Sequence, residues 1–285
     1  MHKQFTTFFL AAVSWLVIGP LVSAPVDNKS AAANAMIDLF AKQDPSGVDR
    51  YFASPYVQHN MRQPDELDAL RRLSQQATTW KGVHTIIRRS LAEGDLVLLH
   101  SLYSNLLGRP GLAVAFDLFR FNKDGKIVEH WDALEPAVGA DATRLAQADG
   151  AVDIVDVEQG TANRKQVLSF VETVLIGGKS ERSGRFIDAR KFVEHSPQRG
   201  DGMMRKQAQF GTATTPEKTI RYLNVHKTVA EGNFVFVQGE ERIGANQVLE
   251  IHDLFRLQDG NIVERWDVLQ PVAPPEQWAN SNGPF

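Results

Sequence analysis

The chain has no cysteine among its 285 residues. That absence excludes disulfide bonds, thiolate metal ligands and a cysteine nucleophile. The chain also lacks an excess of basic charge, because 31 lysines and arginines face 34 acidic residues and no basic stripe is present. Nothing along the chain would neutralise the phosphates of a nucleic acid, so we expect no nucleic-acid partner.

Several motifs that mark common reactions are missing as well. The sequence contains no G-x-S-x-G elbow, no glycine-rich phosphate loop and no HExxH pair. Their absence gives no support to serine catalysis, phosphate binding or a zinc-protease site. The remaining histidines and acids show no tight metal-ligand spacing, so we predict neither a metal nor another cofactor.

Long apolar runs are absent except at the N-terminus, where Phe5 to Val22 is interrupted only by a few polar or small residues. His2 and Lys3 precede this run and Ser23-Ala24 follow it. A basic start, an apolar stretch and small residues predict a signal peptide over residues 1–24. We therefore expect a periplasmic or secreted protein without membrane contact after processing. An uncleaved anchor is the alternative, because the run is at the lower limit for crossing a bilayer.

What the chain does contain is an internal repeat. Asp117–Arg120 and Ile127–Asp132 return, 135 or 136 residues later, as Asp253–Arg256 and Ile262–Asp267. This period is far longer than the roughly 20–50 residues of a solenoid unit, and each copy has the size of a small domain. The repeat predicts the following organisation: domain 1 at 30–137, a linker at 138–159, domain 2 at 160–272 and a tail at 273–285.

Each copy begins with helical patterns and ends with strand-like ones. The predicted helices are 31–41, 64–79, 161–175 and 216–222, with a short extra helix before each histidine motif. The predicted strands are 96–103, 113–121, 127–134, 234–238, 248–257 and 262–269, with Asp-Gly turns before the last strand of each copy. Helices followed by an antiparallel meander indicate an α+β domain.

An aspartate in the penultimate strand is the strongest candidate for chemistry. Side chains alternate across a strand, so Asp117 shares the apolar face of Phe119, and Asp253 shares that of Phe255. A carboxylate on such a face is costly unless it is paired or faces a cavity, and an apolar cavity raises its pKa toward the range useful for proton transfer. The alternative is a buried ion pair with a nearby base: Arg120, His130 or Arg265.

The last strand supplies a second pair of candidates. His130 and Asp132 share one face, and the corresponding residues of copy two are Arg265 and Asp267. A histidine–aspartate pair can orient a general base or an electrophile, whereas an arginine–aspartate pair is more often a salt bridge. His59 and His195, each at the end of a short apolar segment, are weaker candidates because a lone histidine usually bonds backbone.

The motifs Tyr56–Asn60, Asp117–Arg120 and Gly125–Asp132 resemble the SnoaL-like family of the nuclear-transport-factor-like superfamily. The ending Asn280–Phe285 resembles that of a bacterial SnoaL-like subgroup described as aldol-condensation enzymes. The resemblance covers both copies. It implies two tandem cone-shaped α+β barrels, each with three helices packed on a curved antiparallel sheet around an apolar pocket.

The resemblance also implies cofactor-free acid–base chemistry on a small carbonyl compound, as in an aldol-type cyclase, lyase or isomerase. It implies these catalytic residues: Asp117 and Asp253 as acid–base groups, His59, His195 and His130 as donors, with Asp132 and Asp267 beside them. The expected pocket lining is Phe119, Phe255, His100 and Arg265. Because related domains dimerise, an intrachain pseudo-dimer is expected. Two alternatives stay open: a non-catalytic pocket for an apolar ligand, and a module that binds a partner protein through its sheet backs.

Overall fold

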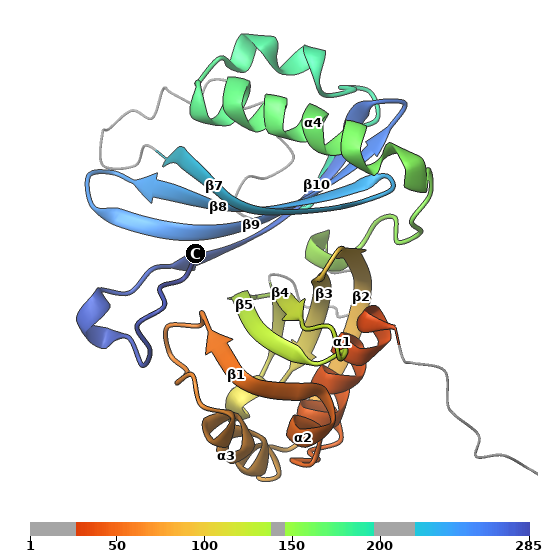
Figure 1. Cartoon of the computed structure of the whole chain (residues 1–285). Coiled ribbons are helices and arrows are strands. Elements are labelled where there is room, and N and C mark those ends of the chain that lie inside the picture. Colours follow the sequence, from red (N-terminus) through yellow and green to blue (C-terminus); the bar gives the residue numbers. More distant parts are fainter. Residues whose placement is uncertain (1–26, 138–145, 197–219) are drawn as a thin grey trace, which may run out of the picture.

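The computed structural model describes residues 27–137, 146–196 and 220–285, and Figure 1 shows them as two α+β domains. The sheets of the two domains face each other across the middle of the molecule, and the helices cover their outer faces. The predicted signal peptide at 1–24 lies outside the described residues, as does the first part of the predicted linker. Among the described helices, none is long and apolar enough to cross a membrane.

The first domain contains three α-helices and five strands. Its helices are α1 (Asn28–Met36), continued by the π-helical η1 (Ile37–Ala41), α2 (Gly47–Tyr51) and α3 (Leu67–Ala77). Its strands are β1 (Phe52–Gln58), β2 (His84–Glu93), β3 (Leu96–Ser104), β4 (Leu112–Phe121) and β5 (Ile127–Pro136), with the short η2 (Leu106–Gly108) before β4. The predicted helices at 31–41 and 64–79 are confirmed.

The second domain repeats this plan in the part that the structure describes. Its helical segments are η5 (Val157–Gln159), α4 (Gly160–Phe170), continued by the π-helical η6 (Val171–Ile176), and η7 (Ser180–Arg185). Its strands are β6 (Val193–Glu194), β7 (Ile220–Glu231), β8 (Phe234–Ile243), β9 (Gln247–Gln258) and β10 (Asn261–Pro271). The remaining short helices are η4 (Ala146–Ala148) between the domains and η9 (Pro275–Gln277) in the tail.

The two sheets have the same strand order. The first is β1-β5-β4-β3-β2 and the second is β6-β10-β9-β8-β7. Strands β2 to β5 and β7 to β10 form the predicted antiparallel meanders, whereas the edge strand β1 runs parallel to β5 and β6 runs parallel to β10. In each domain this edge strand leads into the histidine motif. In the first domain its pairing with β5 places the residues after Gln58 next to His130.

The strands β2 and β7 were missed from the sequence, and the helix predicted at 216–222 was wrong where it can be checked. Residues 220–222 begin β7, and residues 216–219 lie outside the described residues. The strands β2 and β7 are edge strands rich in charged residues such as Arg89 and Lys227, and the other two edge strands, β1 and β6, were not predicted either. Edge strands often carry charge, so they lack the apolar run by which the inner strands were recognised.

The inner face of each sheet forms a separate core with its own helices. In the first domain Leu99, Ala115 and Phe119 pack against Leu39 and Phe40. In the second domain Val237, Ile251 and Phe255 pack against Phe170 and Val174. The strand alternation inferred from the sequence is therefore confirmed, and it places Asp117 and Asp253 on these inner faces with 2% and 0% exposure.

The backs of the two sheets form a third core that joins the domains. Its members come from both halves of the chain: Leu98, Val114, Phe116, Leu118, Trp131, Val229, Phe234, Phe236, Leu254, Trp266 and Val268. Phe116 and Phe236 meet across it with ring centroids 5.9 Å apart. Each buried side chain of this size contributes roughly 1.5–3 kcal/mol. The backs of the two sheets consequently pack against each other within the chain.

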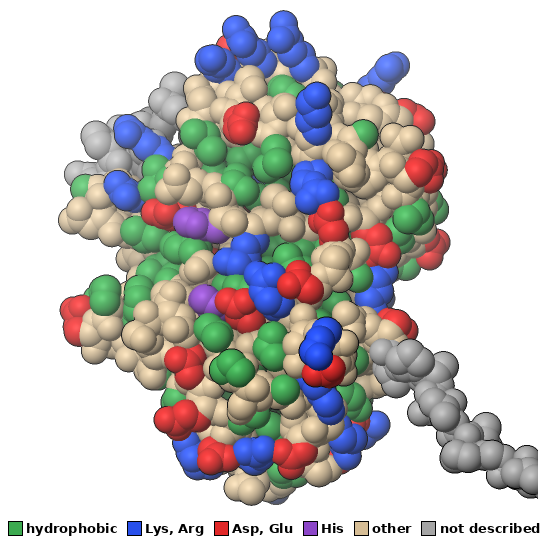
Figure 2. All heavy atoms as spheres, viewed as in Figure 1, with side chains coloured by type: hydrophobic (Ala, Val, Ile, Leu, Met, Phe, Trp, Pro, Cys, Tyr) green, Lys and Arg blue, Asp and Glu red, His purple; other side chains and the backbone are tan. Residues whose placement is uncertain are grey.

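The contacts at this junction are reciprocal. Glu93 accepts a hydrogen bond from the Ala230 amide at 2.9 Å, and Glu231 accepts one from the Ala92 amide at 2.6 Å. Glu231 also pairs with Lys29, as Glu93 pairs with Arg164. Figure 2 shows acidic and basic side chains gathered along the boundary between the two halves. Equivalent residues exchanging equivalent contacts define a two-fold-like, isologous interface within one chain.

Candidate active site

A cavity of about 90 Å³ lies between the sheet and helices of the first domain. Most of its lining is apolar, including Met36, Leu39, Phe40, Phe52, Leu70, Leu73, Leu106, Leu107, Phe119 and Leu134. The polar side chains in it are Tyr56, Gln58, Asn60, Gln63, Tyr103, Asp117, His130 and Asp132. An apolar hollow with a few convergent polar groups is the usual form of a small-molecule site.

Asp117 and Asp132 lie directly opposite each other on β4 and β5. Like charges in such a cross-strand pair destabilise each other, so the acids need compensating partners. Asp117 receives a hydrogen bond from the Tyr103 hydroxyl at 2.8 Å and lies 3.3 Å from Nε2 of His130. Asp132 receives hydrogen bonds from the Asn60 amide at 2.8 and 3.0 Å. No guanidinium group among the described residues pairs with either carboxylate.

Burial changes the acidity of Asp132. The pKa of its carboxyl group is raised to about 6, first because the group is removed from water and then because Asp117 carries a like charge. The charge of His130 and the hydrogen bond from Asn60 oppose this rise. Both aspartates line the cavity, but Asp132 is half-buried whereas Asp117 is 2% exposed. Asp132 is therefore the more accessible of the two carboxylates.

His130 is the third member of the cluster. Burial lowers the pKa of its ring, but the hydrogen bond to Asp117 and the charges of Asp132 and Asp117 outweigh this effect, so the pKa is raised above its ordinary value. The ring stacks on Phe119 with centroids 4.7 Å apart. The two acids thus favour the protonated form of His130, and the ring contacts Asp117 directly. The predicted pairing of His130 with Asp132 on one face of the last strand is present in the structure.

The same three side chains could also act as metal ligands. Ligand atoms of Asp117, His130 and Asp132 all lie within 4.8 Å of one another. Nitrogen and carboxylate ligands with open positions suit a borderline divalent cation. The sequence analysis missed this possibility, because the ligands come from two strands and show no local spacing. The prediction that no cofactor is used stays a prediction.

The second domain places different chemistry at the equivalent position. Arg265 occupies the site of His130, and its Nε donates to Asp253 at 2.8 Å. Nη2 of Arg265 also lies 3.5 Å from Asp267, and Nη1 lies 3.5 Å from Glu194. The guanidinium is fully buried among these carboxylates. Asp253 is therefore part of a buried ion-pair network, which was the alternative considered for this residue, rather than an acid facing an open cavity.

His59 and His195 do not enter the cavity, contrary to the role as pocket donors implied for them. His59 stacks on Trp131 with centroids 4.6 Å apart, and its ring nitrogens lie 2.8 Å from Gly283 O and 2.9 Å from Glu129 Oε1. His195 stacks on Trp266 at 4.6 Å. Trp131 and Trp266 belong to the core between the two sheets, so both histidine rings lie on the backs of their sheets. They hold the strand ends in place.

Two other predicted lining residues are also placed elsewhere. His100 lies in the core between the domains, where it stacks on Phe116 at 4.2 Å and contacts Arg89 at 3.1 Å. Removal from water lowers the pKa of His100 well below its usual range. Phe255 packs against Phe170 in the second core. Of the predicted lining residues, Phe119 lines the cavity that the structure shows.

Sequence reasoning missed Tyr56, Tyr103 and Asn60 as site residues. Tyr103 reaches Asp117 across β3 and β4, and no motif marks it. Tyr56 and Asn60 belong to the segment around His59, so the segment was singled out for the wrong residue. Burial raises the pKa of both tyrosines well above the ordinary value. Both hydroxyls therefore keep their protons at neutral pH and can donate hydrogen bonds.

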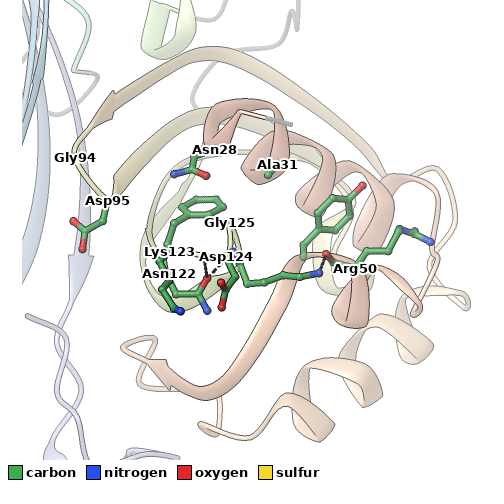
Figure 3. Close-up of a pocket in the computed structure, with 12 residues that line it drawn as sticks. Asn28, Ala31, Arg50, Gly94, Asp95, Asn122, Lys123, Asp124 and Gly125 are labelled. Carbon is green, nitrogen blue, oxygen red and sulfur yellow. Dashed lines mark hydrogen bonds between the residues drawn. The ribbon is translucent and has the colours of Figure 1, made fainter. Parts of the chain in front are cut away.

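A larger hollow of about 690 Å³ lies at the turn end of the same barrel (Figure 3). It is formed by the turns around Gly94 and Gly125 together with the start of α1. In Figure 3 the Asn122 side chain bonds the backbone of its own turn, at 3.0 Å to the amides of Asp124 and Lys126. The polar groups here stabilise turns and do not converge on one point, so the smaller cavity is the candidate active site.

Comparisons with known proteins find a matching family model and several similar solved structures. Residues 33–130 match the family model of the SnoaL-like domain. Similar solved structures include TsrD from Streptomyces laurentii, with 18% identity over 39% of this chain and 91% of that one and a TM-score of 0.33. A steroid delta-isomerase from Pseudomonas aeruginosa shows 23% identity over 40% of this chain and 85% of that one, with a TM-score of 0.30.

An NTF2-like protein from Mesorhizobium loti is 20% identical over 39% of this chain and 97% of that one, with a TM-score of 0.32. No curated protein matches the sequence. The family match spans α1 to the middle of β5 and includes Asp117 and His130. Residues 33–130 thus match the SnoaL-like domain, and the second half of the chain repeats the strand order of the first.

Proposed function

We propose that the first domain is a cofactor-independent acid–base catalyst that acts on a small carbonyl compound, as an isomerase or an aldol-type cyclase or lyase. One observation carries the proposal. Asp132 is a carboxyl group in a mostly apolar cavity, with a pKa of about 6, and no guanidinium among the described residues holds it. A carboxylate with a pKa near 6 can both remove and return a proton at neutral pH.

The roles of the neighbouring residues follow from their contacts. Asp132 removes a proton from the carbon beside a carbonyl group, and the electron pair moves to the carbonyl oxygen. His130 and the Tyr56 hydroxyl line the same cavity and supply hydrogen-bond donors to this oxygen as its charge develops. Asp117 and Tyr103 orient His130, so Asp117 acts as a positioning residue and Asp132 as the base.

Two outcomes complete the reaction. In an isomerisation, protonated Asp132 returns the proton to a different carbon of the enolate. In an aldol closure, the enolate carbon forms a bond with a second carbonyl carbon, and the proton moves to the resulting alkoxide. The cavity volume of about 90 Å³ is below the roughly 300–1,000 Å³ of sites for drug-sized ligands. A compact ketone or aldehyde therefore fits better than a polycyclic substrate.

The test is exchange of α-protons into deuterated water for a panel of small ketones, followed by NMR. We expect Asp132→Asn to reduce the exchange rate by about a hundredfold or more, in line with the loss of a general base. The matched control is Asp267→Asn at the equivalent position of domain 2, which should leave exchange unchanged. Exchange that survives Asp132→Asn contradicts the proposal. Saturable ketone binding without exchange in the wild type would instead support a binding pocket.

A further inference from the structure

The tail that follows the second domain returns to the first domain. The Ala279 amide donates to Met61 O at 2.8 Å, and the Asn280 side chain donates to both Asn60 O and Gln63 O at 2.9 Å. Asn282 donates to Gln58 O at 2.9 Å and also to Asp65. All these contacts fall on residues 58–65, the loop between β1 and α3. Two asparagine side chains thus bond to the backbone of this one loop.

This loop forms one wall of the candidate active site. Gln58, Asn60 and Gln63 line the cavity. The Asn60 side chain is fixed at both ends, because its Oδ1 accepts the Arg62 amide at 2.9 Å while its Nδ2 faces both oxygens of Asp132. Asn60 can hold this position only while the loop backbone keeps its place, and the tail asparagines bond to that backbone on either side of Asn60.

The end of the tail is anchored at the junction of the domains. Gly283 O lies 2.8 Å from Nδ1 of His59, and Pro284 O accepts a hydrogen bond from Gln238 at 3.0 Å. The Phe285 ring stacks on His226 with centroids 4.1 Å apart. His59, which is excluded from the cavity, therefore has a function: it holds the tail against the strand that leads into the loop.

The first domain's own C-terminal segment makes the corresponding crossing. The Trp266 indole donates to Asp149 O at 2.9 Å, and a Cβ atom on Gly150 would lie 3.0 Å from Nε2 of His195. Gly150 and Gly283 both have positive φ, 87° and 74°. Each domain thus sends the segment after its last strand to the histidine motif of the other. This exchange gives the second domain a role in the site of the first.

We propose that the tail Ala279–Phe285 is a positioning element of the first domain's site, and that it holds Asn60 against the Asp132 carboxylate. The inference rests on the function proposed above for Asp132. Through it, the second domain contributes to catalysis by its tail and not by its own aspartate. Because the two domains belong to one chain, the tail always stays close to the site. If the second domain were a separate protein, it would have to bind the first domain to bring the tail there.

The experiment compares Asn280→Ala/Asn282→Ala with Ser281→Ala, a matched control because Ser281 is the exposed residue between the two asparagines. The full chain is titrated by carboxyl-carbon NMR, with Asp132→Asn used to assign the Asp132 signal. The Asn60 hydrogen bond lowers the pKa of Asp132, so its loss should move the Asp132 midpoint upward. We expect this upward shift in Asn60→Ala and in the double tail variant, and no shift in Ser281→Ala.

Activity gives the second measurement. The double tail variant should lose about tenfold in ketone exchange, the size expected for one lost hydrogen bond to a charged group. In an Asn60→Ala background the tail substitutions should have no further effect. An unmoved Asp132 midpoint in the folded double variant overturns the tail proposal, whatever the activity. If Asp132→Asn leaves exchange intact while the tail still moves the midpoint, the proposed function fails and the positioning role stands.

Discussion

The two domains keep the same pair of cross-strand aspartates and differ in the cation beside them. In the first domain His130 bonds one aspartate and leaves Asp132 facing a cavity. In the second domain Arg265 reaches both aspartates. A guanidinium is always charged and has five donors in a rigid fork, whereas an imidazole has two nitrogens and can lose its proton. The exchange of His130 for Arg265 thus accompanies the difference between Asp132, which lines a cavity, and Asp267, which lies in an ion-pair network.

A second difference between the domains accompanies the exchange of His130 for Arg265. Gln58 of the first domain corresponds to Glu194 of the second, and both accept the amide two residues later, at 2.9 and 3.2 Å. Glu194 also lies 3.5 Å from Arg265. The second domain has thus gained a buried acid together with the buried arginine. Burying a charge is costly without a partner, so the two changes belong together.

The space in the barrels differs as well. In the second domain a Cβ atom at Gly239 would lie 1.9 Å from the Tyr222 hydroxyl, so the glycine makes room for this ring. Tyr222 is 4% exposed and belongs to the second core. The residue of the first domain that corresponds to Gly239 is Ser101. It pairs with Ala115 on the next strand, as Gly239 pairs with Ile251. Among the described residues, the interior of the second barrel is therefore filled more completely at this point.

The largest expected effect on stability concerns the cation itself. Arg265→Met leaves Asp253, Asp267 and Glu194 without their shared guanidinium, and breaking a buried ion pair from one side costs about 3–5 kcal/mol. His130→Met in the first domain removes one hydrogen bond to Asp117 and should cost about 1–3 kcal/mol. Urea unfolding at neutral pH measures both. Equal losses in the free energy of unfolding would contradict the structural role assigned to the Arg265 cluster and the functional role proposed for the His130 cluster.

A smaller effect concerns the pH dependence of stability. The pKa of Asp132 is 3.8 in its ordinary state and about 6 in the folded chain, so the folded state binds the proton more tightly than the unfolded state. This preference stabilises the fold below the unfolded pKa and is lost as the pH rises through the folded pKa. Relative to Asp132→Asn, the wild type should lose up to about 3 kcal/mol between about pH 3 and pH 7.

The measurement is urea unfolding of both proteins across this pH range. Water entering the cavity would reduce the figure, since Asp132 is partly exposed. The matched substitution in the second domain is Asp267→Asn, for which no gain relative to the wild type is expected at the higher pH, because Arg265 lies beside the charged form. A pH-independent difference between wild type and Asp132→Asn would show that this carboxyl is not held in an unfavourable environment.

The smallest effect concerns the cations that cross the junction. Lys227 of the second domain lies 4.3 Å from the Trp131 ring, and Arg89 of the first lies 4.1 Å from the Trp266 ring. Arg89 also donates to the carbonyl groups of Ala148 and Ala151. Lys227→Met should cost about 1 kcal/mol, the size of a cation–π contact.

Arg89→Met should cost about 2 kcal/mol or more, because it also removes hydrogen bonds to the segment between the domains. Thermal unfolding of the two variants in the same buffer makes the comparison. A larger loss for Lys227→Met than for Arg89→Met would show that the two crossings are not equivalent in the way their geometry indicates.

The sequence by itself determined the duplication, the α+β class and the inward direction of Asp117 and Asp253. These features depend on local rules, since the side chains of a strand alternate whatever the strand packs against. The inner strands were recognised because they are apolar. The edge strands β2 and β7 were not, because their charged residues are accommodated by neighbours that are distant in the sequence.

The tertiary structure alone decided which acid faces a cavity and which residues position it. Asp132 lines the cavity beside Asp117, which Tyr103 and His130 engage, and these side chains come from three strands. His59 was drawn away from the site by Trp131 and by a tail more than 220 residues later in the chain. Contacts of this kind depend on how the sheets pack and on where the chain returns, and no local pattern encodes either.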